Sequence, residues 1–434
     1  MSLPALSLPG AVALRNVDFR RYWLGHITAV SGQQMLWVAQ GWLIYELSGS
    51  AVLLGVAGLA RAIPATILSL VGGAMADKVD QRRLLMGIQL GQMALLAILG
   101  TLTMIEEVQI WHLMVIVSAS AAAQSFENPA RQAIFPRLVP REALMDAVAA
   151  NSTVHPGSRF FGPVIGGLIM VQVRVWTDLP LAGAGALFYL TAFGYLMNAR
   201  FLYLIRLPRI EGRSKTSMVD DIVQGIKIIA AQPLFMTLIA MTYWSQFFGW
   251  SLQSLFPVFA KDVFHGGELE LSLMYSALGG GSLLGAAMAS NLRGVRRRGL
   301  IILGGFTGAG AVVVLFSLIP VFELALGVLV MMGTAQSLFN VSAQSSLHHV
   351  VPDEFRGRVM GVWGMTYTSV QPMGQLQMGA MAAAVSAPFA VAVGGVAILV
   401  AAVVITLSQG HLRRLTFADD PAEEAAPAPV ASRH

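Results

Sequence analysis

Residues 73–83 read Gly-Ala-Met-Ala-Asp-Lys-Val-Asp-Gln-Arg-Arg, a short charged run between two long apolar stretches, 51–76 and 84–105. A helix needs about 20 mostly apolar residues to cross the hydrocarbon core of a bilayer. Both stretches are long enough, so this segment predicts two membrane-spanning helices joined by a charged loop. Because lysine and arginine are enriched in the cytoplasmic loops of membrane proteins, the loop is expected to face the cytoplasm.

The composition of the whole chain agrees with a membrane location. Of its 434 residues, 56% are hydrophobic and only 12% are charged, whereas a soluble domain carries about 25% charged residues. Cysteine is absent, which excludes disulfides, thiolate metal sites and cysteine nucleophiles. We expect no metal and no cofactor. The net charge of +5 is distributed as in a membrane protein, so we expect no nucleic-acid partner either.

Apolar windows of similar length recur along the chain and predict an all-α polytopic membrane protein with twelve transmembrane helices. The windows are 22–46, 51–76, 84–105, 111–134, 144–172, 179–200, 233–259, 271–291, 300–319, 322–345, 359–384 and 387–409. The last two are nearly continuous, and we separate them at Pro388 because proline breaks or bends helices.

The basic residues indicate an even number of spans. The chain has 28 lysines and arginines, and all but four lie at the termini or in the even-numbered connections. The exceptions are Arg174 and Lys261 in odd-numbered connections, and Arg61 and Arg159 within spans. This asymmetry predicts a multi-pass protein of the inner (cytoplasmic) membrane with both termini in the cytoplasm.

Two features divide the spans into halves of six. The longest connection has apolar residues at helical spacing from Met218 to Ala231, which predicts an amphipathic helix on the membrane surface. Special residues also recur at an offset of 212 residues, as in transporters with parallel halves: Gln34 and Gln246, Gly73 and Gly285, Asn128 and Asn340, Gln132 and Gln344, Val139-Pro140 and Val351-Pro352, Glu142 and Glu354, Gly162 and Gly374, Gly167 and Gly379. We therefore expect a cytoplasmic N-terminus (1–21), a first bundle (22–200), a linker (201–232), a second bundle (233–409) and a disordered tail (410–434).

The run at 73–83 resembles the signature loop of the major facilitator superfamily, G-x-x-x-D-[RK]-x-G-x-[RK]-[RK], with Asp80 in place of the second glycine. In that family the aspartate faces the start of the eleventh helix, and a helix N-terminus stabilises a carboxylate. Breaking and remaking this contact would bias a two-state motion. The alternative is a charge cluster that only sets the topology. The gating residues implied by the resemblance are Gly73, Asp77, Lys78, Arg82, Arg83, Arg131, Gly357 and Arg358.

The fifth predicted span contains Gly-Ser-Arg-Phe-Phe-Gly-Pro-Val-Ile-Gly-Gly at 157–167. This resembles the G-x-x-x-G-P-x-x-G-G element of major facilitator antiporters, with the first spacing one residue longer. Glycines spaced in this way let helices approach closely, and a proline in a span permits a bend. The alternative is tight helix packing of no special function. The residues of the element are Gly157, Gly162, Pro163, Gly166 and Gly167.

Further segments look like the enterobactin-exporter branch of the superfamily, which includes macrolide-efflux-like members; they are Ala60-Arg61, Asn128-Pro129-Ala130-Arg131, 138–142 and 351–360. The resemblance implies a monomeric secondary transporter in the lipid bilayer that exports a small amphipathic molecule, siderophore-like or drug-like, in exchange for protons. An importer or uniporter of a small metabolite and a non-transporting membrane sensor are the alternatives. An enzyme is disfavoured because H-E-x-x-H, G-x-S-x-G and phosphate-loop motifs are absent from the sequence.

In the major facilitator fold the first, fourth, seventh and tenth helices line a central cavity, and amides beside aromatics suit amphipathic organic ligands. The cavity residues expected on this basis, together with Arg61, are Gln34, Trp37, Gln124, Asn128, Tyr243, Gln246, Asn340 and Gln344. A charge within a span costs at least about 2.5 kcal/mol, so Arg61 and Arg159 must face protein or water. For Arg61, recognition of an anionic substrate or neutralisation of a coupling carboxylate competes evenly with a structural ion pair; for Arg159 we favour the ion pair.

Proton exchange needs an ionisable group inside the spans, and few are available. Glu127 lies on a presumed cavity helix with Arg131 one turn away, where burial and the arginine act on its proton affinity in opposite directions. We predict Glu127 as the coupling residue. Asp146, near the cytoplasmic surface, and His155, within the fifth span, are the alternatives.

The charge asymmetry generates a topology prediction. A reporter that is active only in the cytoplasm, fused after Lys215, should be active because the linker is expected on that side. Activity only of a periplasm-specific reporter at the same position would contradict the twelve-span arrangement. A fusion after Glu107, in an odd-numbered connection, is the control with the opposite expected result.

Overall fold

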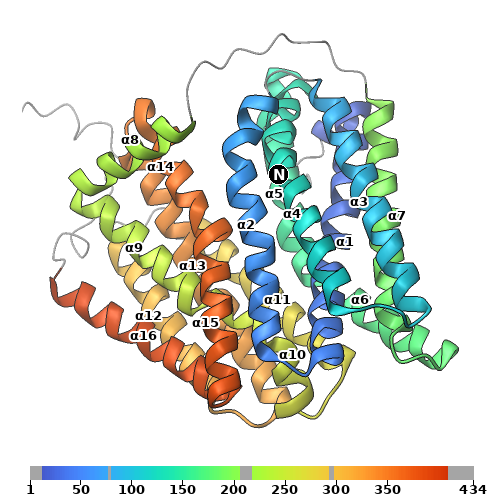
Figure 1. Ribbon diagram of the computed structural model, residues 1–434. Helices are drawn as coiled ribbons and strands as arrows, with labels where there is room; N and C mark the ends of the chain where they lie inside the picture. Colours follow the sequence, from blue (N-terminus) through green and yellow to red (C-terminus); the bar gives the residue numbers. More distant parts are fainter. Residues whose placement is uncertain (1–11, 77–79, 206–217, 293–297, 409–434) are drawn as a thin grey trace, which may run out of the picture.

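The computed structural model describes residues 12–76, 80–205, 218–292 and 298–408, and these residues form an all-helical protein (Figure 1). In the first half the helices are α1 (Val17–Ser48), α2 (Ala51–Ala76), α3 (Gln81–Met104), α4 (Ile110–Ile134), α5 (Leu144–Ser152), α6 (Val154–Thr177) and α7 (Ala182–Leu204). Short turns η1 (Ala13–Arg15), η2 (Phe135–Arg137) and η3 (Arg141–Ala143) accompany them. Helices α5 and α6 follow one another with a single residue between them and together correspond to the fifth predicted span.

The second half repeats this order with two broken spans. Its helices are α9 (Pro233–Phe248), α10 (Phe256–Val258), α11 (Glu268–Asn291), α12 (Arg298–Ser317), α13 (Phe322–Val350), α14 (Asp353–Met365), α15 (Gln371–Ala384) and α16 (Ala387–Ser408), with turns η4 (Trp250–Leu255), η5 (Phe259–Val263) and η6 (Thr366–Val370). The seventh span runs from α9 to η5, and the eleventh joins α14 and α15 through a π-helical turn, η6. Joined across these breaks, the described residues contain twelve long helical segments in the predicted order, which confirms the fold class.

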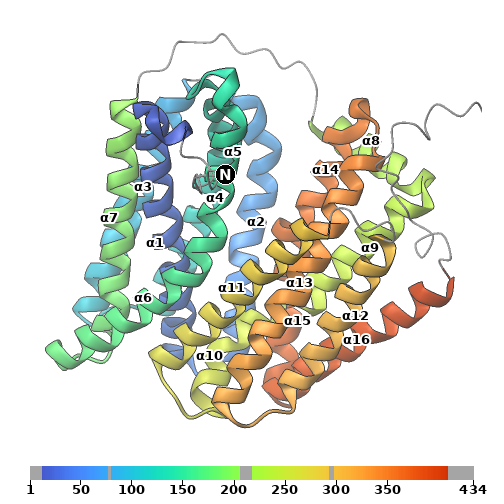
Figure 2. The ribbon, with the colours of Figure 1, turned by 180° about the vertical axis from the view of Figure 1, so that it is seen from behind.

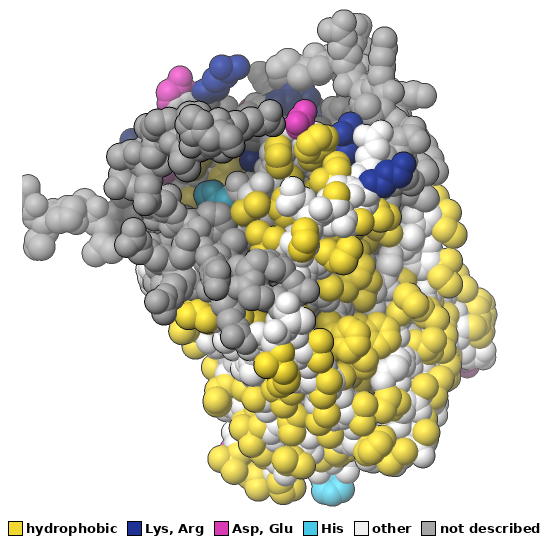
Figure 3. Space-filling view, turned by 90° about the vertical axis from the view of Figure 1, so that its left-hand side faces the viewer, with side chains coloured by type: hydrophobic (Ala, Val, Ile, Leu, Met, Phe, Trp, Pro, Cys, Tyr) yellow, Lys and Arg dark blue, Asp and Glu magenta, His cyan; other side chains and the backbone are white. Residues whose placement is uncertain are grey.

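The outer surface of the bundle is suited to lipid. Seven of the described helices are long and apolar enough to cross a membrane by these criteria alone, and a bent pair makes an eighth. Large apolar side chains such as Trp176 and Leu407 are 76% and 78% exposed. Figure 3 shows apolar side chains over the middle and lower part of one face, with the charged side chains gathered near its upper end. Because a helix satisfies its own backbone hydrogen bonds, this surface needs no water.

The predicted linker helix is present as α8 (Met218–Ala231). The chain turns by 112° between α8 and α9, the change of direction expected where a helix on the membrane surface leads into a span. A methyl group on Gly225 would lie 2.6 Å from the carbonyl oxygen of Arg358, so α8 packs closely on α14. We call the end of the molecule that carries α8 and the start of α1 the linker end, and the opposite end, near α10, the closed end (Figures 1 and 2).

The glycines of the sequence repeat make equivalent contacts inside each half. A methyl group on Gly162 would lie 3.0 Å from Cβ of Gln34, so α6 packs closely on α1. Its repeat partner Gly374, in α15, packs in the same way against the backbone of Phe247 in α9. Gln34 and Gln246 are themselves repeat partners and both are buried. The repeat is therefore visible in three dimensions as one packing arrangement used twice.

A second set of glycines joins the two halves. Gly167 in α6 packs against Ser272 in α11, and Gly379 in α15 packs against the Ala51 carbonyl in α2. Gly167 and Gly379 are repeat partners. Gly167 belongs to the first half and contacts the second, whereas Gly379 belongs to the second half and contacts the first. The interfaces α6–α11 and α2–α15 are thus related by an approximate two-fold relation between the halves.

The contacts of Gly162 generate a stability prediction. Gly162→Ala should lower the melting temperature of the detergent-solubilised protein, because its methyl group crowds Gln34 and overpacking costs about 1–3 kcal/mol. Gly157→Ala is the matched control, since its methyl group meets no atom within 4 Å and gains the same helix propensity. Equal melting temperatures of the two variants would contradict the close α1–α6 packing.

Candidate functional site

A cavity of about 420 Å³ lies between the two halves. Helices α1, α2, α4 and α6 contribute to it from the first half, and α9, η4, α11, α13, η6 and α15 from the second. Amide and aromatic side chains make up much of its wall: Trp37, Gln40, Gln246, Trp250, Gln253, Tyr275, Asn340, Tyr367, Gln371 and Gln375. Arg61 and Arg159 are the only charged side chains among the described residues that line it. The cavity is therefore amphipathic and positively charged.

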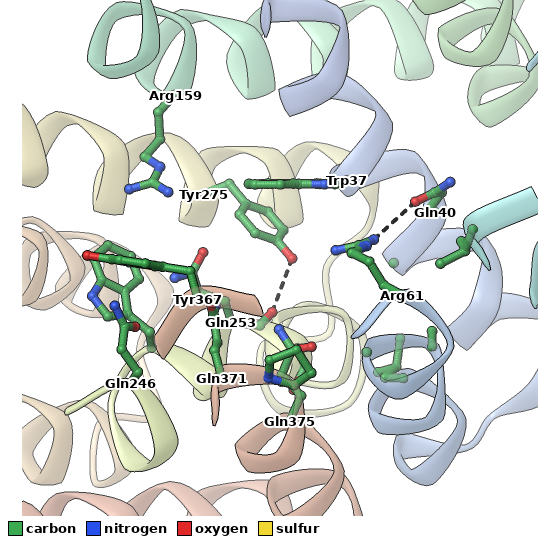
Figure 4. A pocket seen from close by; sticks show the side chains of 18 of the residues that line it. Trp37, Gln40, Arg61, Arg159, Gln246, Gln253, Tyr275, Tyr367, Gln371 and Gln375 are labelled. Atoms are coloured by element: carbon green, nitrogen blue, oxygen red, sulfur yellow. Dashed lines mark hydrogen bonds between the residues drawn. The ribbon is translucent and has the colours of Figure 1, made fainter. Parts of the chain in front are cut away.

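Both arginines lie over aromatic rings of the cavity wall, and Figure 4 shows their side chains among the other lining residues. The guanidinium of Arg61 lies 5.8 Å from the ring centre of Trp37, and its Nη2 donates to Oε1 of Gln40 at 3.4 Å. The guanidinium of Arg159 lies 5.1 Å from the ring centre of Trp250. Neither arginine forms an ion pair within the described residues. These residues therefore do not support the structural ion pair that we favoured for Arg159 and considered for Arg61.

The structure brings together part of the expected cavity set. Trp37, Arg61, Gln246 and Asn340 line the central cavity, and Gln124 lines a second one. The other expected residues lie elsewhere: Gln34 is buried against Gly162, the Tyr243 hydroxyl donates to the Val362 carbonyl at 3.0 Å, and Gln344 is exposed outside the cavity lining. The side chain of Asn128 lies outside the described residues.

Several residues of the cavity wall come from spans that sequence reasoning did not assign to it; Arg159 on α6 is one, and four others are tyrosines and glutamines of the second half. Tyr275 lies on α11, Tyr367 in η6, and Gln371 and Gln375 on α15. The spacing of Gln371 and Gln375 by four residues places them on one helix face, which was a usable signal. The π-helical turn η6, which sets the position of Tyr367 in the span, has no recognisable sequence signature.

A second cavity of about 410 Å³ lies within the first half and holds two of the three predicted proton-coupling residues. Glu127 accepts a very short hydrogen bond from Arg131, and both line this cavity. The Arg131 guanidinium lies 5.7 Å from the ring centre of Tyr22, and the rings of His26 and His155 are 5.5 Å apart. Asp146 lies in the first turn of α5 and is not part of this lining.

Charged side chains also join the halves at the closed end. Lys261 Nζ donates to Glu46 Oε2 at 2.7 Å, and Arg174 Nη1 lies 3.4 Å from Glu268 Oε2. The Tyr45 hydroxyl donates a very short hydrogen bond to Asp262. Each of these pairs has one member in each half, so they stabilise the contact between the halves at this end.

The predicted gating loop is only partly described. Asp77 and Lys78 lie outside the described residues, and of Gly73 only the helical backbone is described. Asp80, the departure from the family pattern, accepts hydrogen bonds from the backbone N–H groups of Arg82 at 3.0 Å and Arg83 at 3.2 Å, so it caps α3.

The remaining gating candidates lie at the linker end or in the second cavity. Arg82 donates to the Tyr203 carbonyl at 2.6 Å. Gly357 and Arg358 lie in α14, where the Arg358 guanidinium is 6.0 Å from the ring centre of Phe355. Arg131 belongs to the Glu127 pair described above. The gating role of this set stays a prediction.

The arrangement of the helices matches known transporters. The inward-facing, occupied structure of a bacterial homologue of the human lysosomal transporter Spinster superposes with a TM-score of 0.70 at 14% identity, covering 95% of this chain and all of that one. A D-xylose–proton symporter superposes with a TM-score of 0.69 at 13% identity, covering 93% and 99%. The chain therefore has the fold of these transporters, with a cavity between its two halves.

The sequence places the chain more narrowly. It belongs to the transmembrane secretion effector family, whose profile matches residues 10–433. Macrolide efflux protein A of Streptococcus pyogenes is 20% identical over 83% of this chain and 88% of its own length. The enterobactin exporter of Shigella boydii is 24% identical over 91% and 92%. The resemblance to this branch, predicted from the motifs, is confirmed.

The contact of Gly167 with Ser272 generates a conformational prediction. Gly167→Val should disfavour the state with the halves joined at the closed end, because its side chain would occupy the space of Ser272. A cysteine in place of Ser254, which lines the central cavity, should then react faster with an impermeant maleimide applied from the closed-end side. The chain has no native cysteine, so the label reports this position alone. Gly157→Val is the control, and equal labelling in both variants would contradict the role of this contact.

Proposed function

We propose that this protein exports a small amphipathic molecule across the inner membrane in exchange for protons, by alternating access. The observation that carries the proposal is the central cavity between two halves that are joined at one end. Ion pairs and glycine contacts hold the closed end together, while the helices of the halves diverge toward the linker end (Figures 1 and 2). This is one of the two states that alternating access requires.

The direction in which this state faces follows from the basic residues. Lysines and arginines concentrate at the termini and in the connections of the linker end, and the positive-inside rule places such segments in the cytoplasm. We therefore take the described state as inward-facing, ready to load its cargo from the cytoplasm. The inward-facing Spinster homologue noted above supports the same interpretation.

The second cavity supports proton coupling. Glu127, Arg131, His26 and His155 lie together within the first half, inside the span region. A carboxylate that is paired with an arginine in one state and released in another changes its proton affinity between the states. We propose Glu127 as this group, with His155 as the neighbouring alternative; Asp146, in the first turn of α5 at the linker end, is the weaker candidate.

The cavity wall supports an amphipathic cargo. Aromatic rings and side-chain amides share the wall of a chamber of about 420 Å³, within the range of sites for small organic molecules. Two relatives carry efflux or export in their names, one for macrolides and one for the siderophore enterobactin. Export is therefore favoured over import, uniport or a sensor without transport.

Flux into proteoliposomes tests the proposal. Catecholate siderophores, macrolides and dyes should be screened with and without an imposed pH gradient. At least one should accumulate faster with the gradient, and its movement should be accompanied by protons in the opposite direction. Flux that does not saturate, or that ignores the gradient, would contradict proton-coupled exchange.

The same assay tests the coupling residue. Glu127→Gln should reduce gradient-driven flux to the rate seen without a gradient, because the side chain no longer binds and releases a proton, while exchange down a substrate gradient persists. Asp146→Asn tests the alternative carboxylate and should retain the gradient effect. If Glu127→Gln also retains it, the coupling role moves to His155, or to Asp146 if Asp146→Asn loses the effect.

A further inference from the structure

The charges of the central cavity restrict what it can bind. Of the described side chains that line it, Arg61 and Arg159 are charged and the others are neutral. They enter from different helices, α2 and α6, and Figure 4 shows them on opposite sides of the rings of Trp37 and Tyr275. A positive charge this far within a span is costly unless a partner neutralises it.

No protein partner supplies this neutralisation in the described residues. The five ion pairs there involve other basic residues. Glu127, the carboxylate that we predict to bind the coupling proton, is paired with Arg131 in the separate second cavity. The Arg61 guanidinium donates to the amide oxygen of Gln40 at 3.4 Å and lies over the face of Trp37, and neither neighbour carries a negative charge. Each guanidinium group therefore has N–H donors that can bind a ligand.

The aromatic rings of the cavity do not favour a cationic ligand. A cation is attracted to the face of an aromatic ring, but a guanidinium already lies over Trp37 and another over Trp250. A positively charged ligand would be repelled by both arginines. A flat ligand with acidic groups would instead place its charge on the guanidiniums and its body beside the rings, since guanidinium binds planar oxyanions through paired hydrogen bonds.

We propose that the substrate site selects aromatic organic anions, with Arg61 and Arg159 as the groups that bind their acidic substituents. This inference rests on the proposed function, because it assigns the substrate class of the same cavity. It makes both arginines specificity-determining residues. It also separates this cavity from one built for a positively charged amphipath, in which carboxylates would stand where these arginines do.

Two dyes with the same ring system test the charge preference. Fluorescein is anionic near neutral pH and tetramethylrhodamine methyl ester is cationic, and both share the xanthene skeleton. Their binding to the purified full-length protein is measured by fluorescence anisotropy at fixed ionic strength. The wild-type protein should bind fluorescein on the order of tenfold more tightly, the effect of a charge-assisted hydrogen bond.

Three variants locate the preference. Arg61→Gln and Arg159→Gln should each lose most of it, and Arg61→Lys should keep part of it, because lysine retains the charge without the planar fork. Arg200→Gln is the matched control: it also removes one positive charge, but Arg200 is exposed on α7, outside the cavity lining. If Arg61→Gln does not fold, Arg159→Gln and Arg61→Lys decide the outcome.

The results separate this inference from the proposed function. Equal binding of both dyes to the wild type, or an unchanged preference in both glutamine variants, would overturn the anion assignment. Gradient-driven flux of the cationic dye without anion preference would overturn it and leave the transport function standing. Selective fluorescein binding that needs both arginines, but without flux of any compound, would support the site and contradict the transport function.

Discussion

The close approach of the two halves at one end is the contact on which the rest of the structure depends. Gly167 and Gly279 lie in the α6–α11 interface, and Gly55 and Gly379 lie in the α2–α15 interface. Because glycine has no side chain, the helix backbones approach closely at these positions. Small residues are what helix contacts in a membrane require, because lipid offers no hydrophobic drive for larger ones to associate. The central cavity is the space left where the halves diverge from these contacts.

The four basic residues that depart from the cytoplasmic charge pattern all lie where the two halves meet. Arg174, in the last turn of α6, and Lys261, in η5, pair across the halves with Glu268 and Glu46. Arg61 and Arg159, inside spans, line the cavity between the halves. Among the described residues, these four positive charges lie where the two halves meet, either paired with a carboxylate or in the cavity lining.

The glycines of the antiporter-like element in the fifth span make two kinds of contact, one within the first half and one between the halves. Gly162 and Gly166 face α1 within the same half, and Gly167 faces α11 in the other half. A methyl group on Gly157 would meet no neighbouring helix within 4 Å. A motif that is continuous in sequence therefore supports both the interior of one bundle and the interface between bundles, because successive residues of a helix point to different neighbours.

The sequence by itself determined the number and order of the helices, the linker helix and the repeat, because these depend on the period and length of apolar segments and on where charges lie. The resemblance to the major facilitator family also led us to expect Arg61, Trp37 and Gln246 at a cavity, and all three line the central one. Only the tertiary structure decided that Tyr275, Tyr367, Gln371 and Gln375 share that cavity, that Gln34 and Tyr243 pack elsewhere, and that Arg61 and Arg159 find no carboxylate in the described residues. The face that each helix turns to its neighbours depends on breaks such as η6 and on contacts between residues far apart in the chain, which local periodicity does not record.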